Sequence, residues 1–230
     1  MAVVRRIPCV VAAITDHGER VYTVELEPSS PVPRFKPGQF LHLALDPYDG
    51  AGFWPESRVF SIASSPRDRE RLTITYAVKG AFTTRMEREL VPGAPVWIKL
   101  PYGEFAVDPD RDAVLFAGGT GVTAFTAFLD SLTPDQEARV RLFYGCRTSD
   151  LFVYGPLVEA RGSEVPALDV ILVCEETDGR LSVDAAWPAI EALDDPIVYL
   201  SGPPAMLDAI TAQLVARQVP AERIRTDAWE

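Results

Sequence analysis

The sequence predicts two domains, an antiparallel six-stranded β-barrel followed by an α/β domain built on a parallel sheet. Residues 3–105 read as one strand after another, with apolar and polar side chains alternating and Gly or Pro between the segments. After the polar stretch VDPDRD at 107–112, apolar strands alternate with amphipathic helical segments, which is typical of a parallel sheet covered by helices. A chain of 230 residues can bury two separate cores. We place the domains at residues 1–106 and 107–230.

Six strand segments make up the first domain, and turn residues separate them. They span residues 5–15, 20–28, 38–46, 57–66, 71–79 and 95–105. A helical segment at 83–90 interrupts them. It begins at Thr83, whose hydroxyl can cap free backbone N–H groups, and it carries Met86 and Leu90 on one face. Six short strands in succession favour a small antiparallel barrel.

The second domain alternates four apolar strands with four helices. The strands are expected at 113–118, 140–145, 168–176 and 196–202, and the helices at 122–132, 151–160, 185–193 and 204–218. This alternation predicts βα units whose strands run parallel.

Composition narrows the classes of function. A hydrophobic content of 47% with 24% charged residues, and no apolar run near the ~20 residues that a bilayer demands, indicate a globular protein without membrane insertion. The net charge of −11 weighs against nucleic acid and anionic membranes as partners, because both attract basic proteins. Pro8 and the polar segment ITDHGER interrupt the apolar N-terminal stretch, which favours a first strand over a signal peptide. We therefore expect a cytoplasmic protein.

The cysteines and histidines predict no metal centre. Cys9, Cys146 and Cys174 lie far apart along the sequence without a C-x-x-C pair, and three thiols are fewer than the four that iron–sulfur clusters usually use. We expect reduced thiols. His17 and His42 stand singly, and we expect them to be structural or exposed.

The loops that follow the predicted parallel strands are the first candidates for a ligand site, because ligands bind beyond the carboxyl ends of such strands. These loops contain, in chain order, Gly118, Gly119, Thr120, Gly121 and Thr123, then Gly145 and Arg147, then Ser201, Gly202, Pro203 and Pro204. Backbone N–H groups and hydroxyls in the first loop can hold a pyrophosphate at the start of a helix. For any single loop, glycines that simply make a tight turn explain the pattern equally well.

A Rossmann dinucleotide fingerprint competes for the first loop, because Gly119, Gly121 and Ala124 satisfy G-x-G-x-x-A. That fingerprint requires an acidic residue for the adenine ribose at the end of the second strand. The second strand ends instead in Gly145, Cys146 and Arg147. We therefore disfavour a Rossmann dehydrogenase.

The strand at 57–66 offers a second candidate site. Phe60 can lie flat on an aromatic ligand, Ser61 can donate to a ring nitrogen, and Arg58 can neutralise a diphosphate. Further along, Gly80 precedes Thr83 at a helix start, which is a second position for phosphate oxygens. The alternatives without a ligand are an ordinary alternating strand with one exposed Arg and a capped helix after a loop.

Taken in order, these segments resemble the ferredoxin–NADP reductase superfamily. The matching pieces, from about residue 35 to the C-terminus, are KPGQF, RVFSIASSP, VKGAFT, LPYGEF, GGTGVTAF, YGCR, SGPPAM and IRTDAWE. Each piece is weak by itself, and the ordered set is specific. The resemblance implies a flavin-binding barrel joined to a nicotinamide-binding domain, with FAD rather than FMN as the flavin and NADH or NADPH as the electron donor.

The resemblance also implies cofactor-binding residues in both domains. On the flavin side these are Arg58, Phe60, Ser61 and Ile62 in the strand that matches R-x-Y-S, Tyr76, Ala77 and Val78 at the flavin tail, and Gly80, Ala81, Phe82 and Thr83 in the phosphate-binding turn. On the nicotinamide side they are Gly119, Thr120, Gly121 and Thr123 in the pyrophosphate loop, Arg147 at the adenosine end, Gly202 and Pro203 after the last predicted strand, and Trp229 near the C-terminus.

Three residues are candidates for catalytic roles by the same resemblance. Ser61 matches the position near the flavin N5, Ser201 the position beside the nicotinamide C4, and Asp227 a position from which protons near N5 are held or exchanged. Ser201 stands where the family usually has Cys, and Phe60 where it usually has Tyr. Trp229 either shields the flavin face until nicotinamide displaces it or simply finishes a last strand.

These expectations favour a flavin-dependent NAD(P)H oxidoreductase that transfers a hydride from NAD(P)H to FAD and passes electrons to a protein or small-molecule acceptor. Two alternatives stay open: an NAD(P)H:flavin reductase that uses free flavin as its substrate, and an electron-transfer subunit of a larger complex. The choice between NADH and NADPH is also open, since Arg147 suits a 2′-phosphate whereas Asp150 and the negative net charge oppose one.

Overall fold

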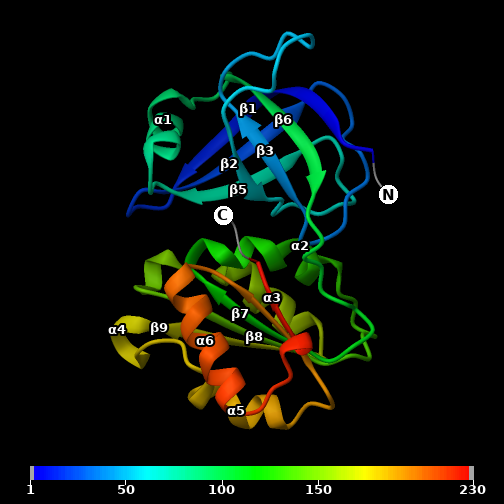
Figure 1. The fold of residues 1–230 in the computed structure, drawn as a ribbon, viewed down its shortest axis with the longest axis vertical. Helices are drawn as coiled ribbons and strands as arrows, with labels where there is room; N and C mark the ends of the chain where they lie inside the picture. Colours follow the sequence, from blue (N-terminus) through cyan, green and yellow to red (C-terminus); the bar gives the residue numbers. More distant parts are fainter. Residues whose placement is uncertain (1–2, 228–230) are drawn as a thin grey trace. The chain divides into compact units, whose positions relative to one another are not determined.

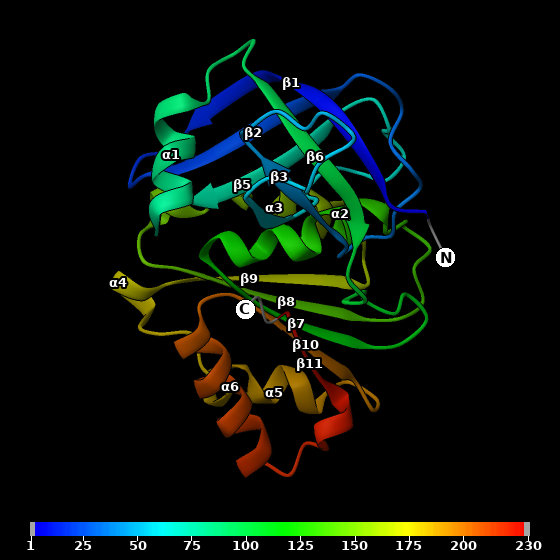
Figure 2. The same ribbon diagram turned by 45° about the horizontal axis from the view of Figure 1, so that its top comes forward.

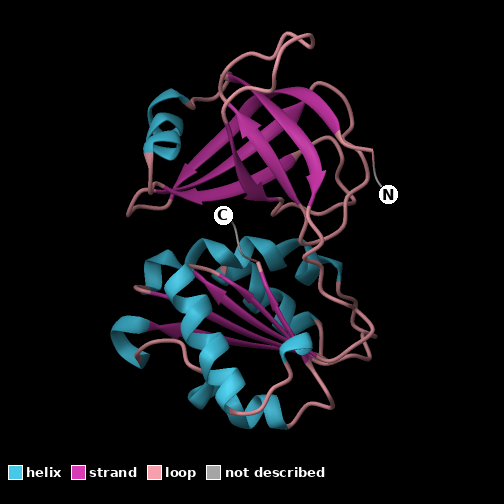
Figure 3. Cartoon of the chain, in the orientation of Figure 1, coloured by secondary structure: helices cyan, strands magenta, loops and turns pink. Residues whose placement is uncertain are grey.

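The computed structural model describes residues 3–227, and the chain divides into two compact units, Met1–Ala106 and Val107–Glu230. The first unit consists mostly of strands, whereas the second alternates strands with helices (Figure 1, Figure 3). Among the described residues, no helix is both long enough and apolar enough to cross a membrane.

The first unit is a nearly closed antiparallel barrel, which confirms the predicted architecture. Its strands are β1 Arg5–Asp16, β2 Val21–Pro28, β3 Phe40–Ala44, β4 Ser57–Ser61, β5 Leu72–Ala77 and β6 Pro95–Tyr102. They pair in the order β4-β3-β6-β1-β2-β5. The two end strands approach each other just after β4, where the Ala63 N–H donates to the Thr73 carbonyl at 2.9 Å.

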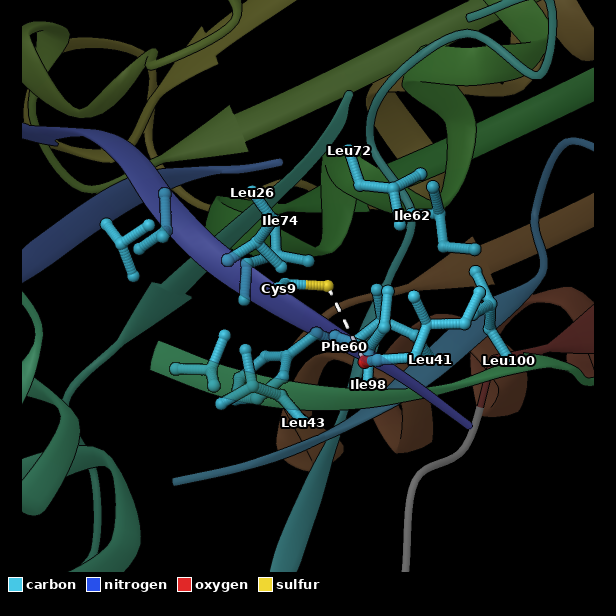
Figure 4. Close-up of a cluster of buried hydrophobic side chains, with 14 of the residues drawn as sticks. Cys9, Leu26, Leu41, Leu43, Phe60, Ile62, Leu72, Ile74, Ile98 and Leu100 are labelled. Carbon is cyan, nitrogen blue, oxygen red and sulfur yellow. Dashed lines mark hydrogen bonds between the residues drawn. The ribbon is translucent and has the colours of Figure 1, made fainter. Parts of the chain in front are cut away.

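Alternate residues of these strands fill the barrel, as the period-two pattern requires. Leu26, Leu41, Leu43 and Ile74 have no exposed surface and lie in one apolar cluster (Figure 4). Cys9 belongs to the same cluster, and its thiol donates to the Ile7 carbonyl at 3.7 Å. Burial raises the pKa of the Cys9 thiol to about 12, so this sulfur is inert as a nucleophile.

The helix α1, Ala81–Glu89, begins two residues before the predicted start at Thr83. Thr83 lies in its first turn, and its Oγ accepts hydrogen bonds from the backbone N–H groups of Lys79 and Gly80 at 2.9 and 3.1 Å. The hydroxyl therefore caps the helix from inside the first turn. Met86 and Leu90 are buried on one face, as their spacing predicts.

The second unit is a parallel sheet of five strands, one more than predicted. The strands are β7 Ala113–Gly118, β8 Val140–Cys146, β9 Leu168–Cys174, β10 Ile197–Ser201 and β11 Ile224–Thr226, in the order β11-β10-β7-β8-β9. A last strand was considered only as an alternative for Trp229, and the pattern did not place β11 because its three residues, with one apolar side chain, show no period.

Helices cover both faces of this sheet, with α2 and α3 on one face and α5 and α6 on the other (Figure 2). The helical elements are η1 Gly119–Val122, α2 Thr123–Ser131, η2 Ser149–Leu151, α3 Gly155–Glu164, α4 Glu175–Asp178, α5 Val183–Glu191, α6 Pro204–Ala216 and η3 Ala221–Arg223. The helix predicted at 151–160 starts later, at Gly155, because the short turn η2 comes first and a proline occupies the first turn of α3. The four-residue helix α4 was not predicted.

Asp112 holds the amino-terminal edge of the sheet together. Its carboxylate accepts hydrogen bonds from the backbone N–H and guanidinium of Arg139 at 2.7–3.0 Å and from the Asp194 N–H at 3.1 Å. Burial raises the pKa of Asp112, but the bonds from Arg139 and Asp194 outweigh burial and keep this pKa below its usual range.

We expect Asp112→Ala to lower the free energy of unfolding by about 1–3 kcal/mol, because the donors of Arg139 and Asp194 lose their charged acceptor. Since the folded pKa of Asp112 is depressed, its contribution is present above the unfolded pKa of about 4 and is lost as pH falls through the folded value. Urea unfolding at neutral and acid pH measures both effects. Asp112→Asn should show a smaller acid-induced loss than the parent, and Asp208→Asn on α6 is the control. Equal acid dependence in all three proteins contradicts the assignment.

Candidate functional site

The strand order brings the loop after β7 beside the loop after β10. The chain adds β8 and β9 on one side of β7 and then crosses to β10 on the other side. The helices α2 and α6, which follow β7 and β10, therefore leave the sheet toward opposite faces (Figure 2). Open parallel sheets bind ligands at the carboxyl ends of strands at such a reversal of order. These two loops form the candidate nucleotide site of the second unit.

The two loops pack so closely that glycine is required in the first of them. A Cβ atom on Gly121 would lie 2.4 Å from the Ser201 carbonyl oxygen, and one on Gly118 would lie 2.5 Å from the Met206 Sδ. Gly119 differs, because it has a φ of +53° and meets no described atom within 4 Å of its Cβ position. Gly118 and Gly121 thus join the loops, whereas Gly119 leaves the backbone open to a ligand.

The threonines of the first loop have different surroundings. Thr123 is the first residue of α2, is 5% exposed, and donates from its hydroxyl to the Thr120 carbonyl at 2.8 Å. The Thr123 hydroxyl therefore holds the backbone of the loop in place. Thr120 is half-buried. The predicted contacts of the loop with a pyrophosphate remain predictions.

Ser201 and Asp227 meet at the end of β10. The Ser201 hydroxyl donates to Asp227 Oδ2 at 3.1 Å, and the Asp227 N–H donates to the Leu200 carbonyl at 2.8 Å, which extends the pairing of β10 and β11. The two residues are 2% and 4% exposed. Sequence reasoning named both residues, and the structure adds that they form one buried hydroxyl–carboxylate pair. Gly202 and Pro203 follow in the same loop, and the predicted Trp229 lies outside the described residues.

The adenosine end predicted for Arg147 lies at the carboxyl ends of β8 and β9. Arg147 is exposed, and its carbonyl accepts a hydrogen bond from the Glu176 N–H at 3.2 Å. Glu176 belongs to α4, whose other acidic residues are Glu175 and Asp178. Sequence reasoning missed these carboxylates, although the run EETD directly after a strand was a visible signal.

In the first unit, Arg58 stands beside the start of α1. Its guanidinium carbon lies 5.2 Å from the Phe82 ring centroid, and its side chain is 52% exposed. Its charge is shared with the exposed Glu56 at 3.2 Å. A Cβ atom on Gly80 would meet no described atom within 4 Å, so the turn before the helix is open. A cation next to a helix N-terminus and an open turn forms a candidate anion site.

The other residues predicted on β4 are buried. Phe60 is 9% exposed and packs edge-on against Tyr76, with ring centroids 6.1 Å apart, and Ile62 is 1% exposed (Figure 4). Ser61 is 8% exposed. Flat stacking of Phe60 on an aromatic ligand remains a prediction, and burial restricts such a contact to the small exposed part of the residue. Exposure increases along the next segment, from buried Tyr76 through half-buried Ala77 and Val78 to exposed Ala81.

Comparison with known proteins agrees with this geometry. A family model described as the oxidoreductase NAD-binding domain matches residues 115–212. Tetrachlorobenzoquinone reductase of Sphingobium chlorophenolicum is 30% identical over 96% of this chain and 67% of its own length. The probable dihydroorotate dehydrogenase B (NAD(+)) electron transfer subunit of Methanopyrus kandleri is 31% identical over 96% of this chain and 79% of its own length.

Two further matches extend these findings. The NAD(P)H-flavin reductase of Vibrio harveyi is 28% identical over 97% of this chain and 98% of its own length. The crystal structure of the Amycolatopsis cytochrome P450 reductase GcoB superposes with a TM-score of 0.84 at 22% identity, over 99% of this chain and 70% of that chain. The chain spans 65% of the reductase component of phenol 2-monooxygenase from Pseudomonas and 55% of the ferredoxin reductase component of a mycobacterial 3-ketosteroid-9-alpha-monooxygenase.

We expect Gly121→Ala to lower the free energy of unfolding by about 1–3 kcal/mol, because the new methyl group overlaps a backbone oxygen that cannot rotate away. Gly80→Ala is the matched control, since its φ is −151° and its methyl group meets open space. Thermal and urea unfolding compare the two variants with the parent. Equal stabilities for both variants contradict the close packing of the two loops.

Proposed function

The chain belongs to the ferredoxin–NADP reductase superfamily, and from this membership we propose that Met1–Ala106 binds FAD while Val107–Glu230 binds NADH or NADPH. The protein is a flavin-dependent NAD(P)H oxidoreductase. The observation that carries the division of roles is the open Gly119 loop at the switch point of the second unit, because that position suits a dinucleotide pyrophosphate.

The residues of the first unit fit FAD. Arg58 supplies an exposed positive charge for a diphosphate, and the turn at Gly80 leaves room for it. Thr83 already accepts from the N–H groups of Lys79 and Gly80, so the N–H groups from Ala81 onward are the donors left at the start of α1 for phosphate oxygens.

The hydride chemistry is supplied by the cofactors when they are bound. The protein binds and orients them, and its Ser201–Asp227 pair adds a fixed polar group at the end of β10. Asp227 accepts from the Ser201 hydroxyl and so fixes the direction of its proton. Because both residues are almost fully buried, water does not compete for that hydrogen bond.

Electrons pass from the flavin to a separate acceptor, and we propose a redox protein for that role. The supporting observation is that several relatives are named as reductase components or electron transfer subunits of larger systems. A second candidate function is a flavin reductase that releases its reduced flavin. Two observations favour it: the burial of Phe60 leaves little aromatic surface to hold a flavin ring, and the Vibrio flavin reductase matches over nearly its whole length.

The test of the function is flavin binding and reduction, with Arg58 as the diagnostic residue. Purified protein should bind FAD. Under anaerobic conditions, NADH or NADPH should reduce the bound flavin, which is measured as loss of its visible absorbance. Arg58→Ala should weaken FAD binding roughly tenfold or more, because a charge-assisted contact contributes about 1.5–3 kcal/mol. Fluorescence titration measures the affinity, and Arg88→Ala, near the far end of α1 with a 71% exposed side chain, is the matched control.

Three outcomes of this experiment separate the hypotheses. Equal FAD affinity for the two arginine variants removes Arg58 from the site. Absence of both flavin binding and nicotinamide-dependent flavin reduction in the parent protein overturns the proposed function. Loss of flavin on dialysis with retained NAD(P)H-dependent reduction of added flavin favours the flavin reductase over the electron-transfer reductase.

We also expect NADH to be preferred over NADPH. The acidic helix α4 lies next to Arg147 through the backbone bond of Glu176, and its negative charge opposes a 2′-phosphate there. Glu175 is partly neutralised by Arg180 at 2.8 Å. The KM for NADH should be at least about tenfold lower than that for NADPH, which corresponds to about 1.4 kcal/mol. Replacing both glutamates with Gln should narrow the ratio severalfold. Glu137→Gln is the control, because Glu137 lies in the loop that precedes β8, at the amino-terminal end of the strands. A preference of the parent protein for NADPH contradicts this assignment.

A further inference from the structure

We propose that Cys146 and Cys174 form a reversible disulfide under hydroperoxide, and that this disulfide weakens dinucleotide binding by the second unit. The two cysteines are distant in sequence, but the register of β8 and β9 pairs them directly. Neighbouring strands lie about 4.8 Å apart, and disulfides join Cα atoms that are about 4.4–6.8 Å apart. The backbone spacing of this register pair therefore lies within the range that a disulfide spans.

Both side chains point to the same face of the sheet. Along β8, Tyr144 shares the face of Cys146, and its ring packs edge-on against Phe152, the residue that follows η2 ahead of α3. Along β9, Val170 shares the face of Cys174 and contacts α3, since a Cβ atom on Gly162 would lie 3.1 Å from its Cγ2. Because side chains alternate strictly along a strand, the two thiols lie together on the face that α3 covers.

The two sulfur atoms differ in access, which defines their roles. Cys174 is half-exposed, whereas Cys146 is 7% exposed. Burial raises the pKa of the Cys146 thiol to about 11, and the neighbouring Cys174 adds to that increase. Cys174 is thus the sulfur that an oxidant reaches first, and Cys146 is the protected thiol that resolves the product.

The chemistry balances with one molecule of hydrogen peroxide. The Cys174 thiolate attacks one peroxide oxygen, breaks the O–O bond and becomes a sulfenic acid, while the other oxygen leaves as hydroxide and takes up the thiol proton as water. The Cys146 sulfur then attacks Cys174, forms the S–S bond and displaces the sulfenic oxygen, which leaves as a second water. Two thiols lose two electrons in total, and the peroxide gains them.

The disulfide removes two hydrogen bonds at the edge where the dinucleotide is proposed to bind. In the reduced protein, the Cys146 thiol donates to the Leu151 carbonyl at 3.2 Å, and the Cys174 thiol donates to the Arg147 carbonyl at 3.6 Å. Both acceptors belong to the segment that follows β8, and Arg147 is its residue at the proposed adenosine end. Oxidation frees this segment from both thiols. The effect on binding rests on the proposed function, whereas formation of the bond does not.

The first experiment tests the bond itself on the purified parent protein. The protein is treated with hydrogen peroxide, its remaining thiols are alkylated under denaturing conditions, and peptides are analysed by mass spectrometry with and without dithiothreitol. We expect a reducible Cys146–Cys174 peptide pair and one alkylated thiol, Cys9. Cys9→Ser is the matched control and should form the same pair. Over-oxidation of Cys174 to sulfinic acid with Cys146 still alkylated, or no change at either sulfur, overturns the proposal.

A second experiment uses the variants Cys146→Ser and Cys174→Ser, with near-UV circular dichroism as the check on folding. Cys146→Ser should accumulate a dimedone-reactive sulfenic acid at Cys174, because the resolving thiol is missing. Cys174→Ser should resist peroxide at Cys146. If Cys146 reacts as readily in that variant as Cys174 does in the parent, the assigned roles are wrong. Should a variant fail to fold, the parent experiment alone decides the proposal.

The third experiment measures the consequence. The Kd for NADH, by titration of the reduced and the peroxide-treated parent, should rise roughly two- to tenfold on oxidation and return with dithiothreitol. Cys9→Ser should behave like the parent, and Cys174→Ser should show no peroxide effect. A disulfide that forms without changing the Kd overturns the regulatory part. Failure of the reduced protein to bind both NADH and NADPH contradicts the proposed function instead and leaves the peptide result unaffected.

Discussion

The close packing of two loops at the carboxyl edge of the parallel sheet is the constraint on which the second unit depends. Gly121 approaches the Ser201 carbonyl so nearly that no side chain fits between them. That approach follows from the strand order, because β7 and β10 are neighbours whose chains depart in opposite directions. It leaves the Gly119 backbone open, and the pairing of β11 with β10 then brings Asp227 to the Ser201 hydroxyl. The loop packing and the pairing of β10 with β11 thus meet at Ser201, whose carbonyl faces Gly121 and whose hydroxyl donates to Asp227.

In the barrel, the candidate anion site is formed by a strand and the start of a helix, whereas in the second unit two loops form the candidate site. A closed sheet has few free backbone groups, so a charged ligand must be held at a loop or a helix end. Here α1 supplies the helix end, and β4 supplies Arg58, whose guanidinium stacks over Phe82 of that helix. The same strand turns Phe60 into the barrel core, where it packs on Tyr76. A single strand therefore serves both the stability of the barrel and the proposed phosphate contact: Arg58 and Phe60 lie two residues apart on one face, with Arg58 exposed near the start of the strand and Phe60 buried.

The carboxyl ends of β8 and β9 hold both the proposed adenosine-binding residue and a pair of neighbouring thiols. Arg147 and the acidic helix α4 meet there, and the same edge holds two thiols in direct register. Parallel strands place residues of equal register at equal height, so a cysteine at the end of each strand produces a pair without any sequence motif. The third cysteine has no such neighbour in the barrel core, because its strand partners there are Pro28 and Val96.

Local patterns were enough to predict the barrel alternation and the helix-covered sheet, because hydrophobic period and glycine-rich strand ends are local properties, and the family resemblance supplied most of the candidate site residues. Tertiary structure decided which of those residues meet. The Ser201–Asp227 pair, Arg58 over Phe82, and the neighbouring Cys146 and Cys174 each join segments that no local pattern relates. Local signals also failed where an element was short: β11 and α4 have three and four residues, and their formation depends on the sheet beside them. Strand order and register arise from the packing of the whole sheet, so they could not be read from any one segment.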